Sequence, residues 1–356
     1  MPRPFWREIW RVENKRVIEA VSKGEKVSVS SWEELITDWK EIDLDWLFSK
    51  ARGVQNKYFS NKVYVRGLIE LTNYCKNNCL YCGIRRDNNI ERYRLSSEEV
   101  MASCRNAYEA GFRTFVIQGG EDLFFTEGRI SSIIKMIKTE FRDCALTLSL
   151  GEREHDDYCR WKEAGADRYL LRHETALEEH YDFLHGKEQS LKKRMECIKV
   201  LKENRYQTGV GFMVDSPGQT PLSLAMDMEY ICKIKPEMVG IGPFLPHKDT
   251  PFHSEKKGDL NKTLFFISLI RLAVPGVMIP ATTALATLSD DGRKKGILAG
   301  ANVIMPNISP VNIRDCYQLY DNKANKGLEA LEGIMELREE MKSIGYEISF
   351  VRGDFI

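Results

Sequence analysis

Eight short apolar runs alternate with amphipathic stretches over most of the chain. The runs are rich in Val, Ile, Leu and Phe, while the stretches between them repeat apolar residues at helical spacing. The runs cover residues 63–71, 114–120, 146–152, 168–174, 208–214, 238–245, 277–283 and 302–307. Nearly continuous apolar strands separated by helices are typical of a parallel sheet covered on both faces. Eight units favour an α/β fold of the (β/α)8 TIM-barrel type over a doubly wound sheet, although six or seven true units fit as well.

Helical patterns flank this repeat at both ends. We expect an N-terminal helical extension over residues 1–60, a barrel over residues 61–320, and a C-terminal helix and tail over residues 321–356. Inside the repeat, the stretch after the first strand opens with a capping box, Ser96 to Glu99, and stops at Gly111. We find no composition shift that marks a second domain.

Polar residues end five of the predicted strands, where a structural core would not place them. They are Gln118, Gly120 and Glu121; Ser149, Gly151 and Glu152; Arg172, His173 and Glu174; Thr282 and Thr283; and Asn307. Loops often begin with polar residues, so one such end would mean little. Because barrel enzymes build their active sites at the carboxyl ends of the strands, the recurrence on five strands predicts a site at this rim.

Composition limits the partners of the protein. The chain has 356 residues, of which 43% are hydrophobic and 29% charged, so that it can bury a large core. Lys plus Arg equals Asp plus Glu at 52 each, without the basic stripe that a nucleic-acid partner requires. No apolar run is long enough to span a membrane, and the first ten residues carry charges where a signal peptide needs an apolar core. We expect a cytoplasmic protein with no nucleic-acid or membrane partner.

Three of the nine cysteines are crowded into "YCKNNCLYCG", residues 74–83, directly after the first strand. The other six are scattered singly and predict buried small apolar side chains. A structural zinc site takes four ligands, usually as two pairs of residues, and the sequence has no second pair. A redox dithiol would use two cysteines and leave Cys75 unexplained. A ferredoxin cluster would need a fourth cysteine. The remaining candidate is a [4Fe-4S] cluster held by Cys75, Cys79 and Cys82, whose fourth iron is open to a substrate.

The C-x3-C-x2-C spacing resembles that of the radical SAM superfamily. The resemblance implies that S-adenosylmethionine (SAM) chelates the open iron, and that one electron from the reduced cluster cleaves SAM to a 5′-deoxyadenosyl radical, which attacks the substrate. It also implies backbone contacts from a glycine–glutamate motif, a glutamate for the ribose or amino group, and an arginine for the carboxylate. The cofactor-binding residues predicted in this way are Tyr81, Gly120, Glu121, Ser149, Glu174, Arg194 and Gly242. No separate catalytic side chain is predicted.

Longer stretches resemble one branch of that superfamily, the FeFe-hydrogenase maturases of the HydE type. They include "RYRLSSEEV", "RYLLRHET", "IPATTA" and "ANVIMPN" within residues 55–320. Biotin synthase and methylornithine synthase resemble the chain less. The likeness implies action on an iron–carbonyl–cyanide–cysteine precursor in assembly of the hydrogenase active-site cluster, with Arg172, Thr282 and Thr283 lining an anion site. It implies an external flavodoxin- or ferredoxin-like electron donor and contact with other maturation proteins.

Two other functions stay open at this point. A radical SAM mutase or lyase acting on an amino acid, like methylornithine synthase, would share the barrel, cluster and cofactor and differ only in the lining of the cavity. A non-catalytic iron–sulfur delivery factor would hold a cluster without cleaving SAM. Some relatives carry three further cysteines near the C-terminus; here Cys316 stands alone, so we expect no second cluster. For Tyr317 and Tyr320 we expect a packing role.

Overall fold

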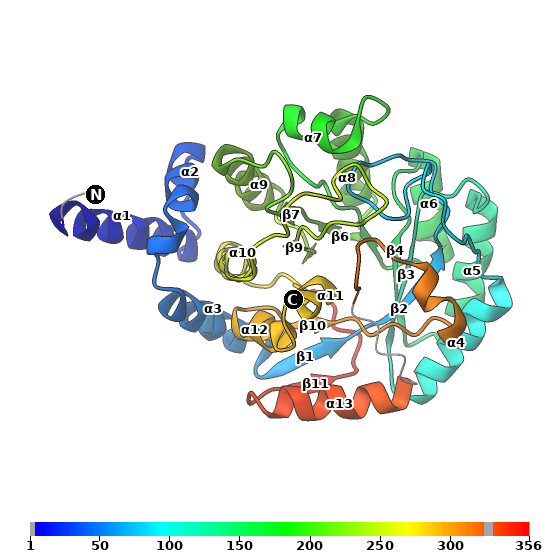
Figure 1. The fold of residues 1–356 in the computed structure, drawn as a ribbon. Coiled ribbons are helices and arrows are strands. Elements are labelled where there is room, and N and C mark those ends of the chain that lie inside the picture. Colours follow the sequence, from blue (N-terminus) through cyan, green and yellow to red (C-terminus); the bar gives the residue numbers. More distant parts are fainter. Residues whose placement is uncertain (1–3, 324–329, 356) are drawn as a thin grey trace.

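Parallel strand segments form a ring at the centre of the computed structural model, which describes residues 4–323 and 330–355 (Figure 1). The segments in the predicted runs are β1 (Lys62–Val65), β2 (Gly67–Thr72), β3 (Thr114–Gly119), β4 (Ala145–Ser149), β5 (Arg168–Leu170), β6 (Gln207–Val210), β7 (Met213–Val214), β8 (Met238–Val239), β9 (Gly242–Pro243) and β10 (Val303–Ile304). A further strand, β11 (Glu347–Ser349), follows the last run. β1 and β2 belong to one predicted run, as do β6 with β7 and β8 with β9. Each of the eight predicted runs therefore contributes to the ring.

The ring follows the order of the chain. β2, β3, β4, β5, β6 and β8 pair in parallel in that sequence. Single parallel bridges then join Met238 to Met278 and Pro280 to Val303, and β10 pairs with β1. A bridge from Leu68 to Asn307 completes the circuit. The predicted (β/α)8 architecture is thus confirmed, and the seventh strand is present only as bridges around Met278 and Pro280.

Helices cover the outside of the ring (Figure 1). They are α4 (Ser97–Glu109), α5 (Glu127–Glu140), α6 (His155–Ala164), α7 (Glu178–His185), α8 (Leu191–Glu203), α9 (Pro221–Ile234), α10 (Leu260–Ala273), α11 (Thr283–Leu288) and α12 (Gly292–Leu298). The capping box of α4 is present, because the Ser96 hydroxyl accepts from the Glu99 amide and the Glu99 carboxylate accepts from the Ser96 amide. Gly111 ends the turn with φ of 101°. The start and stop signals read from the sequence therefore place this helix correctly.

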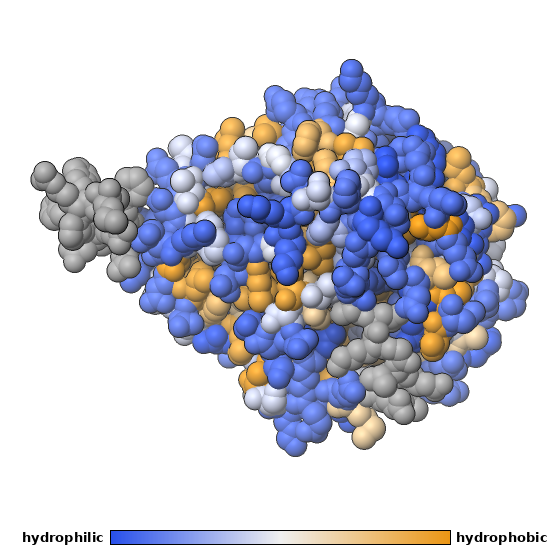
Figure 2. Space-filling view, viewed as in Figure 1, coloured by the Kyte–Doolittle hydropathy of each residue, from blue (hydrophilic) through white to orange (hydrophobic). Residues whose placement is uncertain are grey.

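The N-terminal helices are fastened to one side of the barrel. α1 (Pro4–Ser22), α2 (Val29–Thr37), a 3-10 turn (Trp39–Glu41) and α3 (Leu44–Phe59) precede the first strand. α2 packs on α9, α3 packs on α10, and the Gln55 amide donates to the carbonyl oxygen of Ala301 at 2.8 Å. The face in Figure 2 is mostly hydrophilic, with hydrophobic residues showing around α9 and α10. The extension therefore shares its core with the barrel.

The C-terminal segment adds an element that the hydrophobic pattern does not reveal. A 3-10 turn (Val311–Cys316) and α13 (Ala330–Lys342) lead into β11, which pairs in parallel with β1. The stretch 316–331, on which we expect no second cluster, lies partly outside the described residues, as do the first residues of the predicted C-terminal helix. No helix in the described part of the chain is both long and apolar enough to cross a membrane.

Trp32 tests whether the N-terminal extension is integral to the domain. Its side chain is 1% exposed on α2, and emptying such a site costs about 3–5 kcal/mol. We expect Trp32→Ala to lower the free energy of unfolding of the whole protein by that amount in one cooperative transition, measured by urea denaturation. Trp46→Ala, at a half-buried position on α3, is the control and should cost clearly less. An unchanged main transition in Trp32→Ala would show that the extension unfolds separately.

Candidate functional site

The cysteine-bearing loop follows β2 and is fastened from three directions. The Lys76 amide donates to the carbonyl oxygen of Glu121 at 2.9 Å, and the Leu80 amide donates to that of Leu184 at 2.9 Å. The Gly83 amide donates to the carbonyl oxygen of Leu319, also at 2.9 Å. These partners come from the end of β3, the end of α7 and the segment after the last barrel strand. Main-chain bonds of this kind fix the loop independently of any side chain it carries.

The three thiols of this loop are free and partly exposed. Burial raises the pKa of all three, that of Cys79 to about 12, and the neighbouring thiols act in the same direction on Cys79 and Cys82. The side-chain amide of Gln189 donates to Cys79 Sγ at 3.1 Å. Within residues 4–323 and 330–355, no three His, Cys, Asp or Glu side chains are grouped so as to hold one metal ion. The loop therefore presents three separate sulfur atoms.

Glycines let neighbouring backbone approach this loop closely. A Cβ on Gly120 would lie 2.2 Å from the carbonyl oxygen of Tyr74 and 2.8 Å from Cys75 Cβ. A Cβ on Gly83 would lie 2.2 Å from the carbonyl oxygen of Gln318 and 2.4 Å from the His247 ring. No side chain fits at either point without moving the loop. Gly120, predicted from its motif, thus lies directly against the first cysteine.

Glu121 and Arg194, both predicted to bind the cofactor, lie in one buried charged group. Arg194 Nε donates to Glu152 Oε1 at 2.6 Å, and Arg194 Nη2 lies 3.8 Å from Glu121 Oε1. The Glu152 amide donates to Glu121 Oε1 at 2.9 Å, and Lys76 Nζ lies 3.2 Å from Glu121 Oε2. The site-residue prediction omitted Glu152 and Lys76. Lys76 stands beside Cys75 in the sequence, but no motif indicated its partner.

Arg172 and Glu174 face each other at the end of β5. Arg172 Nη2 and Glu174 Oε2 are 3.0 Å apart, yet among the described residues neither atom has a hydrogen-bond partner of suitable geometry, nor do Arg172 Nε and Thr282 Oγ1. Glu174 has φ of 64°, a costly conformation for a side chain of this size, and its amide donates to the carbonyl oxygen of Gly211. Buried polar atoms without partners mark a place where a polar ligand fits.

Between these two residues in the chain lies His173, whose buried contact with Asp227 supports the strained backbone at Glu174. His173 Nε2 lies 3.3 Å from Asp227 Oδ1, and both side chains are completely buried. Asp227 also accepts from the Ala176 amide at 2.6 Å, which ties the chain on both sides of Glu174 to α9. His173 was noted as a polar strand end; Asp227, in the middle of a helix, carried no signal in the sequence.

The remaining predicted residues lie around the same mouth. Gly242 faces Thr282, because a Cβ there would lie 3.0 Å from Thr282 Oγ1. Thr283 lines a cavity of about 490 Å³ beside α11 and α13, together with Glu70 and Lys323. Ser149 pairs in register with Gln118 at the ends of β4 and β3.

A second buried polar group, which begins on the strand before the cysteine-bearing loop, was missed. Glu70 lies on β2 and forms an ion pair with Lys323, while Asn307 Nδ2 donates to Glu70 Oε2 at 2.8 Å. Lys323 Nζ also donates to the carbonyl oxygen of Tyr317, whose ring is 2% exposed and whose hydroxyl accepts from Gln118 at 3.3 Å. Because Lys323 is far from Glu70 in sequence, only the fold brings them together.

Tyr81 forms part of the wall next to the thiols. Its ring packs with Leu184, Met213 and Phe244, and its hydroxyl lies 3.2 Å from His185 Nε2. His185 Nδ1 lies 2.9 Å from the carbonyl oxygen of Tyr181. Burial, reinforced by the charge of Arg194, lowers the pKa of His185 to about 3. The imidazole therefore stays neutral and links Tyr81 to α7.

Comparisons with known proteins agree with this geometry. Residues 69–231 match the model of the radical SAM superfamily. The chain is 47% identical to the [FeFe] hydrogenase maturase subunit HydE of Thermotoga maritima over 281 residues, covering 78% of this chain and 79% of the relative. It is 31% identical to 3-methylornithine synthase of Methanosarcina acetivorans, over 80% of this chain and 81% of the relative.

Solved structures show the same architecture. The crystal structure of methylornithine synthase (PylB) superposes with a TM-score of 0.82 at 26% identity, covering 93% of this chain and 97% of that one. The FeFe-hydrogenase maturase HydG of Carboxydothermus hydrogenoformans gives a TM-score of 0.75 at 22% identity, covering 95% of this chain and 79% of that one. At the latter identity, the likeness concerns the fold alone.

From the low pKa of His185 we expect a specific loss of stability in acid. An unfolded histidine titrates near about 6.5, whereas the folded one has its pKa lowered to about 3. Between these values the unfolded state binds a proton that the folded state does not, so stability is lost as the pH falls below about 6.5. From pH 7 to pH 5 this amounts to about 2 kcal/mol.

His185→Gln should remove that part of the pH dependence. The measurement is the free energy of unfolding in urea at both pH values. The exposed His155, changed to Gln, is the matched control and should leave the wild-type pH dependence intact. Equal slopes in wild type and His185→Gln would contradict the assignment.

Proposed function

The chain belongs to the radical SAM superfamily, in the family of the FeFe-hydrogenase maturase HydE, and from this premise we propose that it acts on an organometallic precursor of the hydrogenase active-site cluster. The precursor is an iron–carbonyl–cyanide–cysteine complex. The observation that carries the proposal is the 47% identity to the HydE relative over 78% of the chain. We further propose a cytoplasmic enzyme that takes its electron from an external flavodoxin- or ferredoxin-like protein and works with other maturation proteins.

We propose that Cys75, Cys79 and Cys82 hold the [4Fe-4S] cluster of this superfamily, one iron each. The donor set fits, since thiolates are the ligands of such clusters and separate irons do not require the three sulfurs to converge on one point. The side-chain amide of Gln189 points at Cys79 Sγ, and hydrogen bonds to ligand sulfurs tune the reduction potential of a cluster. Gly120 and Gly83 leave room for the loop to close around the cluster.

With SAM bound to it, the reduced cluster supplies homolytic cleavage of a sulfur–carbon bond and thereby a 5′-deoxyadenosyl radical. The chain's own residues hold the cofactor in place. The backbone at Gly120 and the carboxylate of Glu121 lie beside Cys75, where they would hold the amino group of SAM. Glu174 Oε2 forms an ion pair with Arg172 but no well-aligned hydrogen bond within the described residues, so it could accept from a ribose hydroxyl. Arg194 already donates to Glu152, so it serves the SAM carboxylate with Nη2, its more weakly engaged nitrogen.

The substrate end of the site is the wall that carries Arg172 and Thr282. Their unpartnered donors, next to apolar strands, suit cyanide-like or carboxylate groups. Thr283 follows Thr282 in the first turn of α11, and its place next to Thr282 in the chain supports its inclusion in the proposed anion site. A planar guanidinium held next to Glu174 retains N–H groups for a ligand, so it orients the substrate without a proton transfer. This wall gives the site its preference for an anionic ligand.

Anaerobic turnover tests the proposed substrate. Dithionite-reduced protein with SAM should form 5′-deoxyadenosine at least about tenfold faster when the iron–carbonyl–cyanide–cysteine complex is added than when free amino acids are added, because the complex offers cyanide as well as carboxylate groups to the anion site. Arg172→Met should lose this stimulation and keep the slow cleavage without substrate. Acceleration by an amino acid alone would favour the methylornithine synthase-like reaction, and no cleavage at all would favour a delivery factor.

Gly120 tests the placement of the cluster. Gly120→Ala puts a methyl group 2.2 Å from the Tyr74 carbonyl oxygen, so the loop must move and should hold well under half of the wild-type iron and sulfide after anaerobic reconstitution. Gly128→Ala, in the first turn of α5 with nothing within 4 Å, is the control and should load fully. Both variants should keep the wild-type circular dichroism spectrum. Full loading of Gly120→Ala would contradict the proposed cluster position.

A further inference from the structure

The loop between α7 and α8, residues 186–190, contacts the cysteine-bearing loop through two neighbouring side chains. Arg86 donates to both carboxylate oxygens of Glu188, at 3.1 and 3.2 Å. The next residue, Gln189, donates from its side-chain nitrogen to Cys79 Sγ at 3.1 Å. In the part of the chain that the structure describes, no other side chain donates a hydrogen bond to any of the three thiols. Gln189 thus singles out one of the three sulfur atoms.

The other end of the Gln189 amide faces Arg194. Arg194 Nη2 donates to Gln189 Oε1 at 3.4 Å, which is a long bond. The remaining nitrogens of this guanidinium are held more firmly, since Nε donates to Glu152 Oε1 at 2.6 Å and Nη1 to the carbonyl oxygen of Arg172 at 2.9 Å. The nitrogen proposed above for the SAM carboxylate is therefore the one that contacts Gln189.

A side-chain amide passes an electrostatic effect from one end to the other. A guanidinium at the amide oxygen polarises the group, and hydrogen bonds joined in a chain strengthen one another in this way. The N–H group at the other end then becomes a stronger donor. Hydrogen bonds to the ligand sulfurs stabilise the more negative, reduced state of a cluster and so raise its reduction potential. The charge presented by Arg194 can reach the sulfur of Cys79 through this one residue.

We propose that Gln189 is a positioning residue that couples the reduction potential of the cluster to binding of the SAM carboxylate at Arg194. The inference rests on the cluster and cofactor sites proposed above. While Arg194 Nη2 has no other ligand, it polarises Gln189, which donates strongly to Cys79. A carboxylate bound to Nη2 neutralises the guanidinium, so that the bond to sulfur weakens and the potential falls. The cluster becomes a stronger reductant when the cofactor is in place.

Potentiometric titration followed by electron paramagnetic resonance measures this coupling. Wild type and Gln189→Met are titrated with and without S-adenosylhomocysteine, which carries the amino and carboxylate groups of SAM but lacks the sulfonium that is cleaved. Methionine has a similar length and no N–H group. Without the analogue, we expect the reduced-to-oxidised ratio at a fixed potential to be about tenfold lower in Gln189→Met, equivalent to about 59 mV for a one-electron couple.

The analogue should bring the two proteins closer together. Its direct contact with the cluster shifts the potential of both, and this common shift cancels in the comparison. The wild-type amide, however, loses its polarisation, so the difference in ratio should shrink to about threefold or less. Equal ratios without the analogue would overturn the proposal, and so would a difference that the analogue leaves unchanged.

Glu188→Gln is the matched control, because it breaks the ion pair with Arg86 and leaves the Gln189 amide in place. It should give the wild-type ratios in both states. If it shifts them as Gln189→Met does, mobility of the loop explains the effect and the proposal is wrong. Gln189 is half-buried, and all three proteins should bind the same amount of iron and sulfide.

Failure of the proposed function gives a different result. A protein that loads no cluster, or that forms no 5′-deoxyadenosine from SAM under dithionite, would contradict the proposed function and this inference with it. Full loading and normal cleavage in all three proteins, with potentials that do not depend on Gln189, would overturn the coupling alone.

Discussion

Close packing of backbone against the cysteine-bearing loop is the constraint on which the site depends. Gly120 brings the end of β3 against Tyr74 and Cys75 at a distance that no side chain permits, and Gly83 does the same for the segment around Gln318. The loop is thus held on two sides by main chain, and a third bond joins Leu80 to the end of α7. The positions of the thiols follow from the barrel itself. The barrel strands therefore determine where a cluster bound by this loop would lie.

Polar groups at the barrel mouth differ in how completely they are paired. Glu121, Glu152 and Arg194 satisfy one another, and Glu70 is matched by Lys323 and Asn307. Arg172 Nε and Thr282 Oγ1 instead have no hydrogen-bond partner in the described part of the chain, although Arg172 Nη2 lies 3.0 Å from Glu174 Oε2. Because unpaired buried donors are costly, they persist where a ligand completes them. The paired groups give the mouth its rigidity, and the unpaired ones give it a preference for negatively charged or polar ligands.

Local signals in the sequence were sufficient to predict much of the fold and the family. The eight strands followed from short apolar runs, α4 from its capping box, and the family, now confirmed, from motifs next to the strand ends. What the sequence could not supply depends on pairs far apart in the chain. Lys323 meets Glu70 and Asp227 meets His173 only because the barrel closes. β11 was missed because a three-residue strand after a helix has too short a pattern to be recognised.

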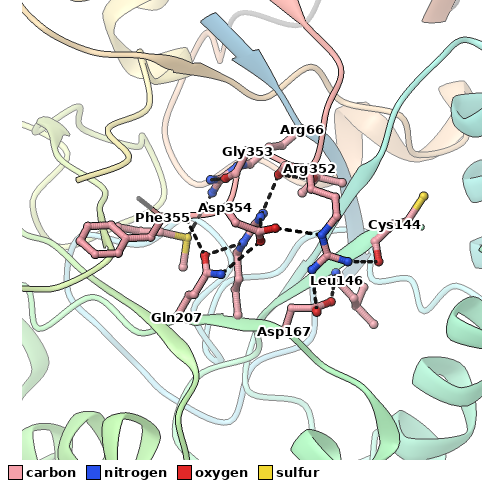
Figure 3. Close-up of polar contacts among 12 residues, drawn as sticks. Arg66, Cys144, Leu146, Asp167, Gln207, Arg352, Gly353, Asp354 and Phe355 are labelled. Atoms are coloured by element: carbon pink, nitrogen blue, oxygen red, sulfur yellow. Dashed lines mark hydrogen bonds and ion pairs between the residues drawn. The ribbon is translucent and has the colours of Figure 1, made fainter. Parts of the chain in front are cut away.

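The two ends of the barrel face opposite electrostatic requirements. Charged groups at the mouth must stay available to a ligand that binds and dissociates. The floor, at the opposite end of the barrel, holds no such ligand in the reaction, so its buried charges must be neutralised by the protein itself. Barrels separate these tasks, since loops at the carboxyl ends of the strands carry activity and the opposite face carries stability. Here the C-terminal tail reaches the floor and brings two carbonyl oxygens and the Asp354 carboxylate to buried arginines (Figure 3). These contacts hold the tail against the first residues of the strands and close the floor of the barrel.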